Sequence, residues 1–249
     1  PICFMAEAGK TTAFIGSTGS GKSTLINLVP RFYDATEGEI LINDKGIKEY
    51  AEVDLINRIG LVPRKGYLFG GTVRSNILFG IKKGTDAQMK KAARIAQATE
   101  FIEKMPKKYE SEISEGGTNV SGGQRQRLSI ARAVAKEPEI FVFDDAFSAL
   151  DMKTDRLLRV ALKEVTKESV VLVVAQRINT IRDAEQIIVL DQGKIVGRGT
   201  HYELLKKCRV YLEIAKSQFS DEELATELAV SSEVGALENA QKKKQKGDK

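Results

Sequence analysis

The sequence predicts an α/β fold with a mostly parallel sheet, and three observations support this prediction. A glycine-rich turn at 16–24 joins a short apolar strand, 12–15, to a segment whose apolar residues recur at helical spacing. Two further apolar runs, 140–143 and 170–175, are typical of buried strands and are separated by a predicted helix. The first of these runs ends in a carboxylate, at the strand end where ligands bind in open α/β sheets.

The turn at 16–24 fits the phosphate-loop pattern G-x-x-x-x-G-K-[ST]. Its glycines let successive backbone N–H groups turn inward around anionic oxygens, and the following helix directs its positive dipole end to the same place. Lys22 adds a positive charge for the β- and γ-phosphates, and the Ser23 hydroxyl is positioned to bind Mg²⁺. A chance glycine- and serine-rich turn is disfavoured because a strand and a helix flank the motif. We therefore predict a site for a nucleoside triphosphate at Gly16, Ser17, Thr18, Gly19, Ser20, Gly21, Lys22, Ser23 and Thr24.

The composition of the 249-residue chain is that of a globular domain with a sizeable core, since 42% of its residues are hydrophobic and 29% are charged. The net charge is +5 and charges of both signs are interspersed, so we expect no nucleic-acid partner. Cys3 and Cys208 lack metal-ligand spacing, which favours a reducing compartment. The longest apolar run, 170–175, is too short to span a bilayer, and we identify no signal peptide. Any membrane role is therefore expected to come through a partner or through chain beyond this sequence.

The remaining segments are predicted from apolar periodicity and from turn residues. Between the phosphate loop and the strand at 140, we expect a hairpin at 39–46, a short helix at 51–58, a strand at 60–63, a glycine-rich loop at 64–72 and helices from 73 to about 108. After residue 144, we expect a turn at 148–151, a helix at 152–167, a strand at 170–175, a hairpin at 187–196 and a last helix at 202–217. The polar, lysine-rich tail, 219–249, is predicted to be disordered.

Two segments besides the phosphate loop are candidate functional sites. Ser121 and Gln124 have capping-box spacing and open a predicted helix whose first turn holds two glycines. That helix start is a candidate anion site, although a capped surface helix is the simpler interpretation of these residues alone. Asp144 ends the apolar strand and is a candidate to hold Mg²⁺ through water, with a plain strand-ending turn as the alternative.

Together these stretches resemble the nucleotide-binding domain of ATP-binding cassette (ABC) transporters, most closely that of the multidrug-exporter half-transporters. The resemblance covers about 1–218, with 16–24 as the Walker A loop and 140–144 as Walker B. It implies a P-loop NTPase (RecA-like) core, a helical signature subdomain at about 73–135 and an antiparallel β subdomain that is truncated at its N-terminus. It identifies the family signature at Val120, Ser121, Gly122, Gly123 and Gln124, and the D-loop at Ser148, Ala149, Leu150 and Asp151.

The resemblance also implies how the domain works. Two such domains pair head to tail, and each ATP lies between the Walker A loop of one domain and the signature of the other. Ser121, Gly122 and Gly123 would therefore touch an ATP held by the partner. Closure of the pair drives the transmembrane domain, which is absent from this chain and would hold it at the cytoplasmic face of the cell membrane. The family's adenine-stacking aromatic, which precedes Walker A, is absent as well, so weaker ATP binding is expected.

Three residues depart from the family pattern. Asp145 stands where the family has a Glu as general base, and its side chain is shorter by about 1.5 Å, a loss of reach that can cost on the order of 10²-fold in rate. Gln176 replaces the switch histidine and cannot carry its positive charge. Arg64 replaces the Q-loop glutamine, has no acceptor for a cation and is able to pair with a phosphate oxygen instead.

Asp145 and Gln176 are interpreted as the catalytic residues of a degenerate site, like that in one half of heterodimeric exporters. We therefore expect an ABC-type ATPase domain that hydrolyses ATP weakly at its own site and pairs with a non-identical half-transporter to export drugs, lipids or peptides. The alternative is a non-hydrolytic ATP-binding module that completes the catalytic site of a partner. A soluble ABC ATPase of DNA repair or translation is disfavoured, because the chain shows neither a long coiled-coil insertion nor a tandem cassette.

Overall fold

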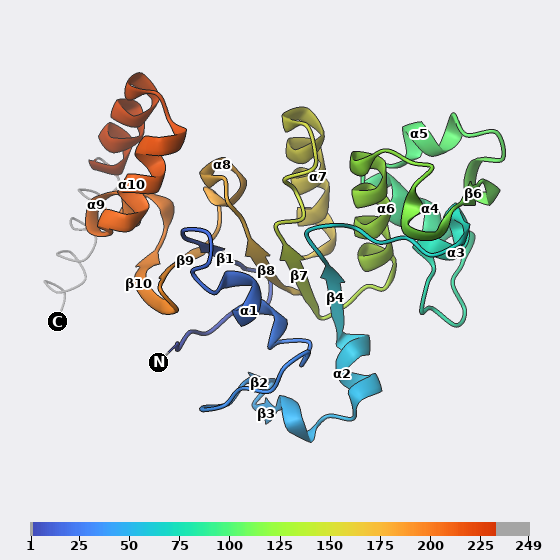
Figure 1. Cartoon of the computed structure of the whole chain (residues 1–249), viewed down its shortest axis with the longest axis horizontal. Helices are drawn as coiled ribbons and strands as arrows, with labels where there is room; N and C mark the ends of the chain where they lie inside the picture. The colour runs from blue at the N-terminus through green and yellow to red at the C-terminus, as the bar shows by residue number, and fades with distance from the viewer. Residues whose placement is uncertain (1, 233–249) are drawn as a thin grey trace, which may run out of the picture. The chain divides into compact units, whose positions relative to one another are not determined.

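The structure is a computed structural model that describes residues 2–232. These residues divide into two units. Unit 1 comprises residues 2–5, 11–22 and 175–232, and unit 2 comprises residues 6–10 and 23–174. Each unit contains parallel strands with helices beside them, as Figure 1 shows, so the predicted α/β class with a mostly parallel sheet is confirmed.

The strands of unit 1 are β1 (Thr11–Ile15), β9 (Gln186–Asp191) and β10 (Lys194–Gly199). β1 pairs with β9 in parallel, with Phe14 opposite Ile188, and β10 returns antiparallel to β9. The central residues of β9 are all apolar and fully buried, which is why this strand lies between the other two. The turn between β9 and β10 uses left-handed backbone at Gln192 and Gly193, so the predicted hairpin is confirmed.

The end of unit 1 differs from the prediction in two places. The single helix predicted at 202–217 is two helices, α9 (His201–Lys207) and α10 (Arg209–Gln218), because Cys208 between them has extended backbone. The predicted disorder of 219–249 is wrong for its first part, since residues 221–232 are helical. Ser220 caps this helix through reciprocal hydrogen bonds with Glu223, and Glu227 on it is only 8% exposed. Residues 233–249 lie outside the described part of the chain.

The sheet of unit 2 consists of three parallel strands, β4 (Ile59–Val62), β7 (Ile140–Asp144) and β8 (Val170–Val174), with β7 in the middle. The register sets Phe143 opposite both Val62 and Val173. Because parallel strands end at the same edge, the loop after β4 and the acidic end of β7 lie close together. The helix α7 (Met152–Val165) follows β7, as predicted.

The helices predicted from 73 to about 108 are present in unit 2, and they gather beside the long helix that follows them (Figure 1). Threonine or serine caps three of the four helices through a capping box, at Thr72, Thr85 and Ser121. Two short strands, β5 (Gly71–Thr72) and β6 (Glu112–Ile113), pair antiparallel next to them. The four helices are α3 (Val73–Ile77), α4 (Asp86–Ile95), α5 (Thr99–Glu103) and α6 (Gly122–Ala135).

The first part of the chain after the phosphate loop is less helical than predicted. The helix α1 (Lys22–Asn27) ends before Pro30, which has no N–H to donate to a helix, and the following turns close through three-residue hydrogen bonds. Phe32, two residues after Pro30, is 56% exposed. The predicted hairpin is present as β2 (Leu41–Ile42) and β3 (Lys45–Gly46), followed by α2 (Glu52–Arg58).

Four short helical elements complete the described chain. Within residues 2–232, none of the helices combines the length and hydrophobicity needed to cross a bilayer. The short elements are α8 (Ile178–Ile181) and the 3₁₀ turns Ile47–Glu49, Lys108–Glu110 and Glu115–Gly117.

Candidate functional site

The phosphate loop follows directly from β1 in unit 1. A Cβ atom at Gly16 would lie 2.0 Å from the carbonyl oxygen of Leu190 on β9, so only glycine fits where the chain leaves the strand. Gly19 and Gly21 have left-handed backbone, with φ of 81° and 94°. Ser17, Thr18 and Gly19 are exposed, whereas Ser20 is buried. The loop is therefore a tight turn, anchored at both ends, whose tip faces solvent.

The side chain of Lys22 folds back over this loop. Its Nζ donates to the carbonyl oxygens of Gly16 and Ser17, at 2.8 and 2.7 Å, and to Ser20 Oγ at 3.1 Å. Lys22 is only 9% exposed, so its ammonium group lies inside the turn and not in solvent. A buried ammonium ion beside a glycine-rich turn is a suitable partner for phosphate oxygens. Gly16–Lys22 is thus a compact, positively charged turn, and its binding of phosphate stays a prediction.

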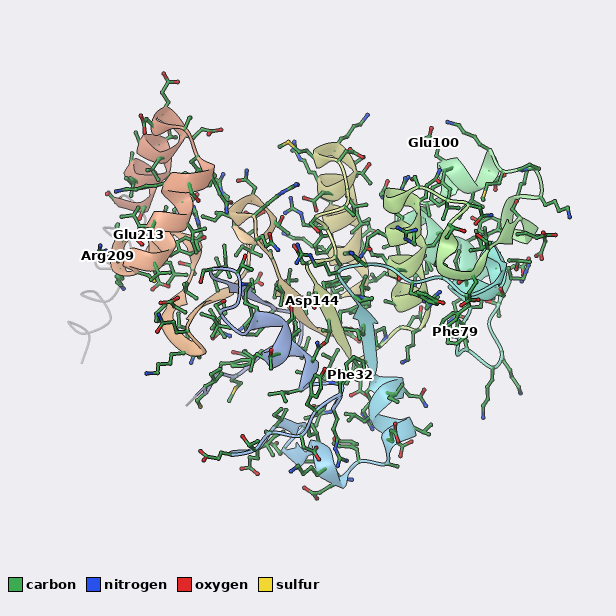
Figure 2. The ribbon with its side chains drawn as sticks, viewed as in Figure 1. Phe32, Phe79, Glu100, Asp144, Arg209 and Glu213 are labelled. Atoms are coloured by element: carbon green, nitrogen blue, oxygen red, sulfur yellow. The ribbon has the colours of Figure 1, made fainter. Side chains whose placement is uncertain are left out.

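The two residues predicted to hold a metal ion are brought together in unit 2. Ser23 Oγ donates a hydrogen bond of 2.9 Å to Asp144 Oδ1, at the end of β7, where Figure 2 labels Asp144. A hydroxyl and a carboxylate are the oxygen ligands that Mg²⁺ accepts in nucleotide sites. Among residues 2–232 there is no cluster of three or more His, Cys, Asp or Glu side chains suited to a metal. The pair offers a hydroxyl oxygen and a carboxylate oxygen side by side, and its binding of Mg²⁺ stays a prediction. Thr24, the last residue of the motif, is exposed.

Asp145, the residue at the general-base position, forms an ion pair with Arg64. The Arg64 Nε atom lies 3.1 Å from Asp145 Oδ2, and the two side chains are 61% and 8% exposed. The Asp145 backbone is left-handed, with φ of 49°, and its N–H donates to the carbonyl oxygen of Val174 at 3.0 Å. The sequence did not predict this contact, since the only partner named there for the Arg64 guanidinium was a phosphate oxygen.

The loop that carries Arg64 is held by a residue that the sequence analysis missed. Gln126 on α6 is 1% exposed; its Nε2 donates to the Pro63 carbonyl oxygen at 3.0 Å, and its Oε1 accepts from the Gly66 N–H at 2.8 Å. These two bonds bracket Arg64 on both sides. Gln126 is polar but lies at a buried position of α6, and a buried polar side chain needs hydrogen-bond partners. The periodicity of apolar residues along the helix does not identify such a position.

The signature segment opens α6 as its spacing predicted. Ser121 Oγ accepts from the Gln124 N–H at 3.2 Å, and Gln124 Oε1 accepts from the Ser121 N–H at 2.9 Å. Val120 is buried, whereas Ser121 and Gly122 are exposed at the helix start. A Cβ at Gly122 would meet nothing within 4 Å, and one at Gly123 would lie 3.5 Å from the Ala149 carbonyl oxygen. This face of the helix start is open and lies next to the D-loop.

The D-loop joins Asp145 to α7. Ser148 Oγ donates to the Asp145 carbonyl oxygen at 2.8 Å, Ala149 is exposed and Leu150 is buried. Asp151 caps α7 by accepting from the Thr154 N–H at 2.9 Å and from its hydroxyl at 2.7 Å. The hydrogen bonds from Thr154 lower the pKa of Asp151. The predicted turn is therefore rigid at both ends.

Gln176, the residue at the switch position, belongs to unit 1 and is exposed. Its backbone is fastened by Gln218 at the end of α10, whose Nε2 donates to the Gln176 carbonyl oxygen at 2.7 Å. The Gln218 Oε1 atom accepts from the Ile178 N–H at 2.8 Å. Gln218 was not predicted as part of the site, since the contact joins segments that are far apart in the sequence.

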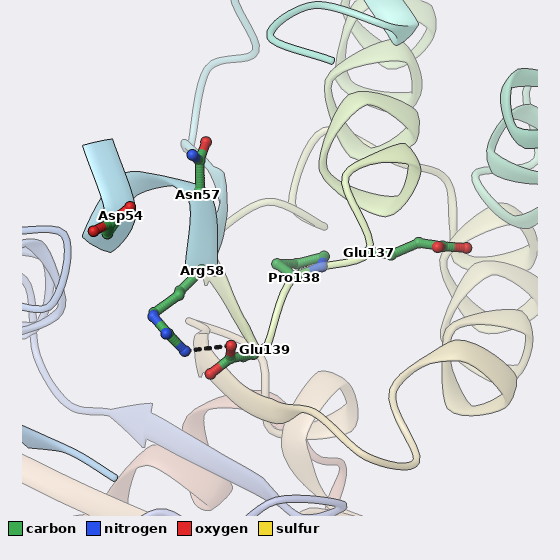
Figure 3. A pocket seen from close by; sticks show the side chains of 6 residues that line it. All are labelled: Asp54, Asn57, Arg58, Glu137, Pro138 and Glu139. Carbon is green, nitrogen blue, oxygen red and sulfur yellow. Dashed lines mark hydrogen bonds and ion pairs between the residues drawn. The ribbon is translucent and has the colours of Figure 1, made fainter. Parts of the chain in front are cut away.

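A separate hollow of about 270 Å³ lies on unit 2 and is shown in Figure 3. Two of its acidic side chains already have basic partners, because Glu139 pairs with Arg58 and Glu137 pairs with Lys91. The excess of carboxylates disfavours an anionic ligand, so we assign no ligand to it. The hollow is lined by Asp54, Asn57, Arg58, Glu137, Pro138 and Glu139.

Comparisons with known proteins agree on one family. The family model described as ABC transporter matches residues 1–148. An uncharacterized ABC transporter ATP-binding protein of Mycobacterium bovis is 47% identical over 220 residues, which cover 87% of this chain and 38% of that protein. A Staphylococcus aureus protein that carries the name of a multidrug export ATP-binding/permease protein is 46% identical over 205 residues, covering 82% and 36%. The solved structure of a bacterial Atm1-family ABC exporter with ATP bound has a TM-score of 0.84 and 37% identity, covering 88% of this chain and 38% of that one. The chain thus spans less than two fifths of these relatives.

Proposed function

Since this chain belongs to the ABC transporter family, we propose that it is the ATP-binding domain of an ABC exporter. The observation that supports this most directly is the buried ammonium ion of Lys22, held inside a glycine-rich turn whose tip faces solvent. The exporter assignment is supported by the names of the Staphylococcus aureus relative and of the solved structure.

The proposed roles of the site residues follow from their chemistry. Gly16–Lys22 would bind the phosphates of ATP through backbone N–H groups and the Lys22 ammonium ion, and Ser23 with Asp144 would hold Mg²⁺. The metal ion would supply positive charge that neutralises the phosphate oxygens. The Asp144 side chain already accepts a hydrogen bond from Ser23, so the two ligands need little rearrangement.

We further propose that hydrolysis at this chain's own site is slow. Asp145 has a shorter side chain than the glutamate expected at the general-base position, and its carboxylate is engaged by Arg64. Gln176 at the switch position is neutral, so it offers a hydrogen bond but no positive charge to a phosphate. Asp145 and Gln176 are the proposed catalytic residues of this weakened site.

The signature would serve a second ABC domain. Ser121, Gly122 and Gly123 present an open, capped helix start, which suits contact with an ATP held by a partner. In this proposal the partner is a non-identical half-transporter, and a transmembrane domain of the same transporter keeps the domain at the cytoplasmic face of the cell membrane. The cargo would be a drug, lipid or peptide.

Steady-state ATP hydrolysis tests this proposal. We expect slow or undetectable turnover by the purified chain, and faster turnover when the chain is mixed with an ABC half that has glutamate and histidine at the two catalytic positions. Ser121→Ala should then lower the turnover of the mixture. Turnover by the chain alone at the rate of the complete half would refute the weakened site. An unchanged rate of the mixture with Ser121→Ala would refute the role of the signature.

The ion pair between Arg64 and Asp145 favours a second candidate, a module that binds ATP without hydrolysing it and only completes the partner's site. The two candidates differ in single-turnover experiments with the chain in excess over radiolabelled ATP. A weak enzyme converts the bound ATP over hours, and Asp145→Asn abolishes the conversion. A purely binding module retains intact ATP, and Asp145→Asn changes nothing.

A further inference from the structure

We infer that Arg64 is an internal lock on the general-base position: its guanidinium holds the Asp145 carboxylate and must leave before that carboxylate can take a proton from water. Arg64 is then a positioning residue that acts through Asp145 and slows hydrolysis without being required for ATP binding. This inference rests on the proposed function, because it assumes that the chain binds ATP.

The Asp145 side of the lock is buried and held by several contacts. Its side chain is 8% exposed, and its backbone N–H donates to the Val174 carbonyl oxygen while its own carbonyl oxygen accepts from the Ser148 hydroxyl. The left-handed φ of 49° is sparsely populated for an aspartate, so the surrounding contacts hold the residue there. A nearly buried carboxylate needs a charged or hydrogen-bonding partner, and Arg64 provides one.

The Arg64 side of the lock has a fixed backbone and a movable head. Gln126 fastens the loop at Pro63 and at Gly66, so the base of the Arg64 side chain is aimed from a set position. Gly66 itself packs closely, since a Cβ there would lie 3.1 Å from the Arg125 carbonyl oxygen. The Arg64 side chain is nevertheless 61% exposed, which leaves its guanidinium free to exchange this contact for water.

The chemistry of the contact explains why it slows hydrolysis. In the general-base step, the proton of the attacking water passes to the carboxylate as its oxygen bonds to the γ-phosphorus and the bond to ADP breaks. The Arg64 guanidinium occupies the Asp145 Oδ2 atom, which would otherwise be able to accept the proton of the attacking water. A guanidinium has only hydrogen-bond donors, so it cannot accept that proton itself. The two proposed Mg²⁺ ligands, Ser23 and Asp144, are not involved in this contact, because Asp144 accepts a hydrogen bond from Ser23 while Arg64 pairs with Asp145. ATP binding and the lock are therefore compatible.

The experiment measures ATP affinity and single-turnover hydrolysis of the 249-residue chain in excess over radiolabelled MgATP. We expect Arg64→Gln to raise the hydrolysis rate by about 5- to 10-fold, part of the 10²- to 10⁴-fold that a general base contributes, with the ATP dissociation constant within about twofold of the wild type. Arg64→Lys keeps the charge and should leave the rate close to the wild-type value. Lys65→Gln removes the neighbouring charge and should change neither quantity. Arg64→Gln in an Asp145→Asn background should show no gain.

Two results would overturn the inference. An unchanged or lower hydrolysis rate in Arg64→Gln would show that the contact does not restrain the base. A loss of ATP affinity in Arg64→Gln but not in Lys65→Gln would make Arg64 a phosphate ligand. Failure of the proposed function gives a different pattern, in which the wild-type chain itself does not bind ATP.

Thermal unfolding keeps the inference testable if Arg64→Gln folds poorly, because an unpaired buried carboxylate is destabilising. The double variant Arg64→Gln/Asp145→Asn removes that carboxylate's charge and should unfold at a higher temperature than Arg64→Gln. The double-mutant cycle should therefore show coupling between the two positions. Additive effects would mean that the pair does not form and would overturn the lock.

Discussion

Replacing Gly16 with alanine tests whether the phosphate loop owes its shape to the close approach of β9. The added Cβ atom would lie 2.0 Å from the carbonyl oxygen of Leu190, whereas real Cβ contacts remain at 3.0 Å or more, so the loop and β9 must separate by about 1 Å. The obstacle is a backbone carbonyl near the end of β9, and no side-chain rotation relieves it. Gly19→Ala is the matched control, because a Cβ there meets nothing within 4 Å.

The expected cost of Gly16→Ala is about 3 kcal/mol, the upper part of the range for overpacking a rigid interior. Gly19→Ala carries only the strain of a left-handed backbone, about 1 kcal/mol. For a chain of this size, each kcal/mol lowers the melting temperature by about 2–4 °C, so the expected decreases are about 6–12 °C for Gly16→Ala and 2–4 °C for Gly19→Ala.

Thermal unfolding monitored by circular dichroism measures both decreases, and titration with MgATP reports on the loop itself. Gly16→Ala should also weaken ATP binding by at least about tenfold, since displacing the loop disturbs the oxygens that hold Lys22. Equal melting temperatures for the two variants would refute the reasoning, because they would show that the contact with Leu190 does not constrain the loop.

Three further predictions concern the rest of the chain. Burial lowers the pKa of His201 from 6.5, although Glu227 opposes this shift, so below pH 6.5 the unfolded chain binds a proton that the folded chain does not. The free energy of unfolding should therefore be constant above pH 6.5 and decrease below it, and the decrease should be smaller in His201→Gln. Urea unfolding of both proteins at pH 7.5 and 5.5 measures this, and an equal loss of stability in the two would contradict it. Burial lowers the pKa of Arg132 to about 10, and its guanidinium donates hydrogen bonds to Asn76 and to the Tyr67 carbonyl oxygen. Arg132→Met should lower the free energy of unfolding in urea by about 2–4 kcal/mol, and a loss below about 0.5 kcal/mol would contradict the buried network. A thiol reagent should label exposed Cys3 in the native chain and leave buried Cys208 unmodified until denaturant is added. Mass spectrometry detects the labels, and rapid labelling of both cysteines in the native chain would be inconsistent with the burial of Cys208.

The strands and the helix caps were predictable because their signals are local. The apolar runs at 140–143 and 170–175 became β7 and β8 with little change in their bounds. The capping box of Ser121 and Gln124 depends only on residues three apart, and it formed as the spacing predicted. The phosphate-loop motif was likewise readable, since glycine and lysine at fixed spacing carry its chemistry.

The errors arose where a distant residue decides local structure. The last helix breaks at Cys208, whose side chain packs against β10; a Cβ at Gly197 would lie 2.6 Å from its sulfur. The helix after residue 219 is held in place by Glu227, which is buried. Its Oε2 atom lies 3.3 Å from His201 Nε2, and its Oε1 atom lies 2.8 Å from the Arg182 guanidinium. Composition alone made this segment look disordered, since its polar residues gave no sign of these partners.

The sequence by itself therefore determined the α/β class, the phosphate loop, the capped signature helix and the identity of the three unusual residues. Only the tertiary structure decided what those residues do to one another. Arg64 and Asp145 meet because β4 and β7 are parallel neighbours whose ends lie at one edge of the sheet, and because Gln126 fastens the loop between them. A contact of this kind depends on strand order and burial, which residue spacing along the chain does not encode.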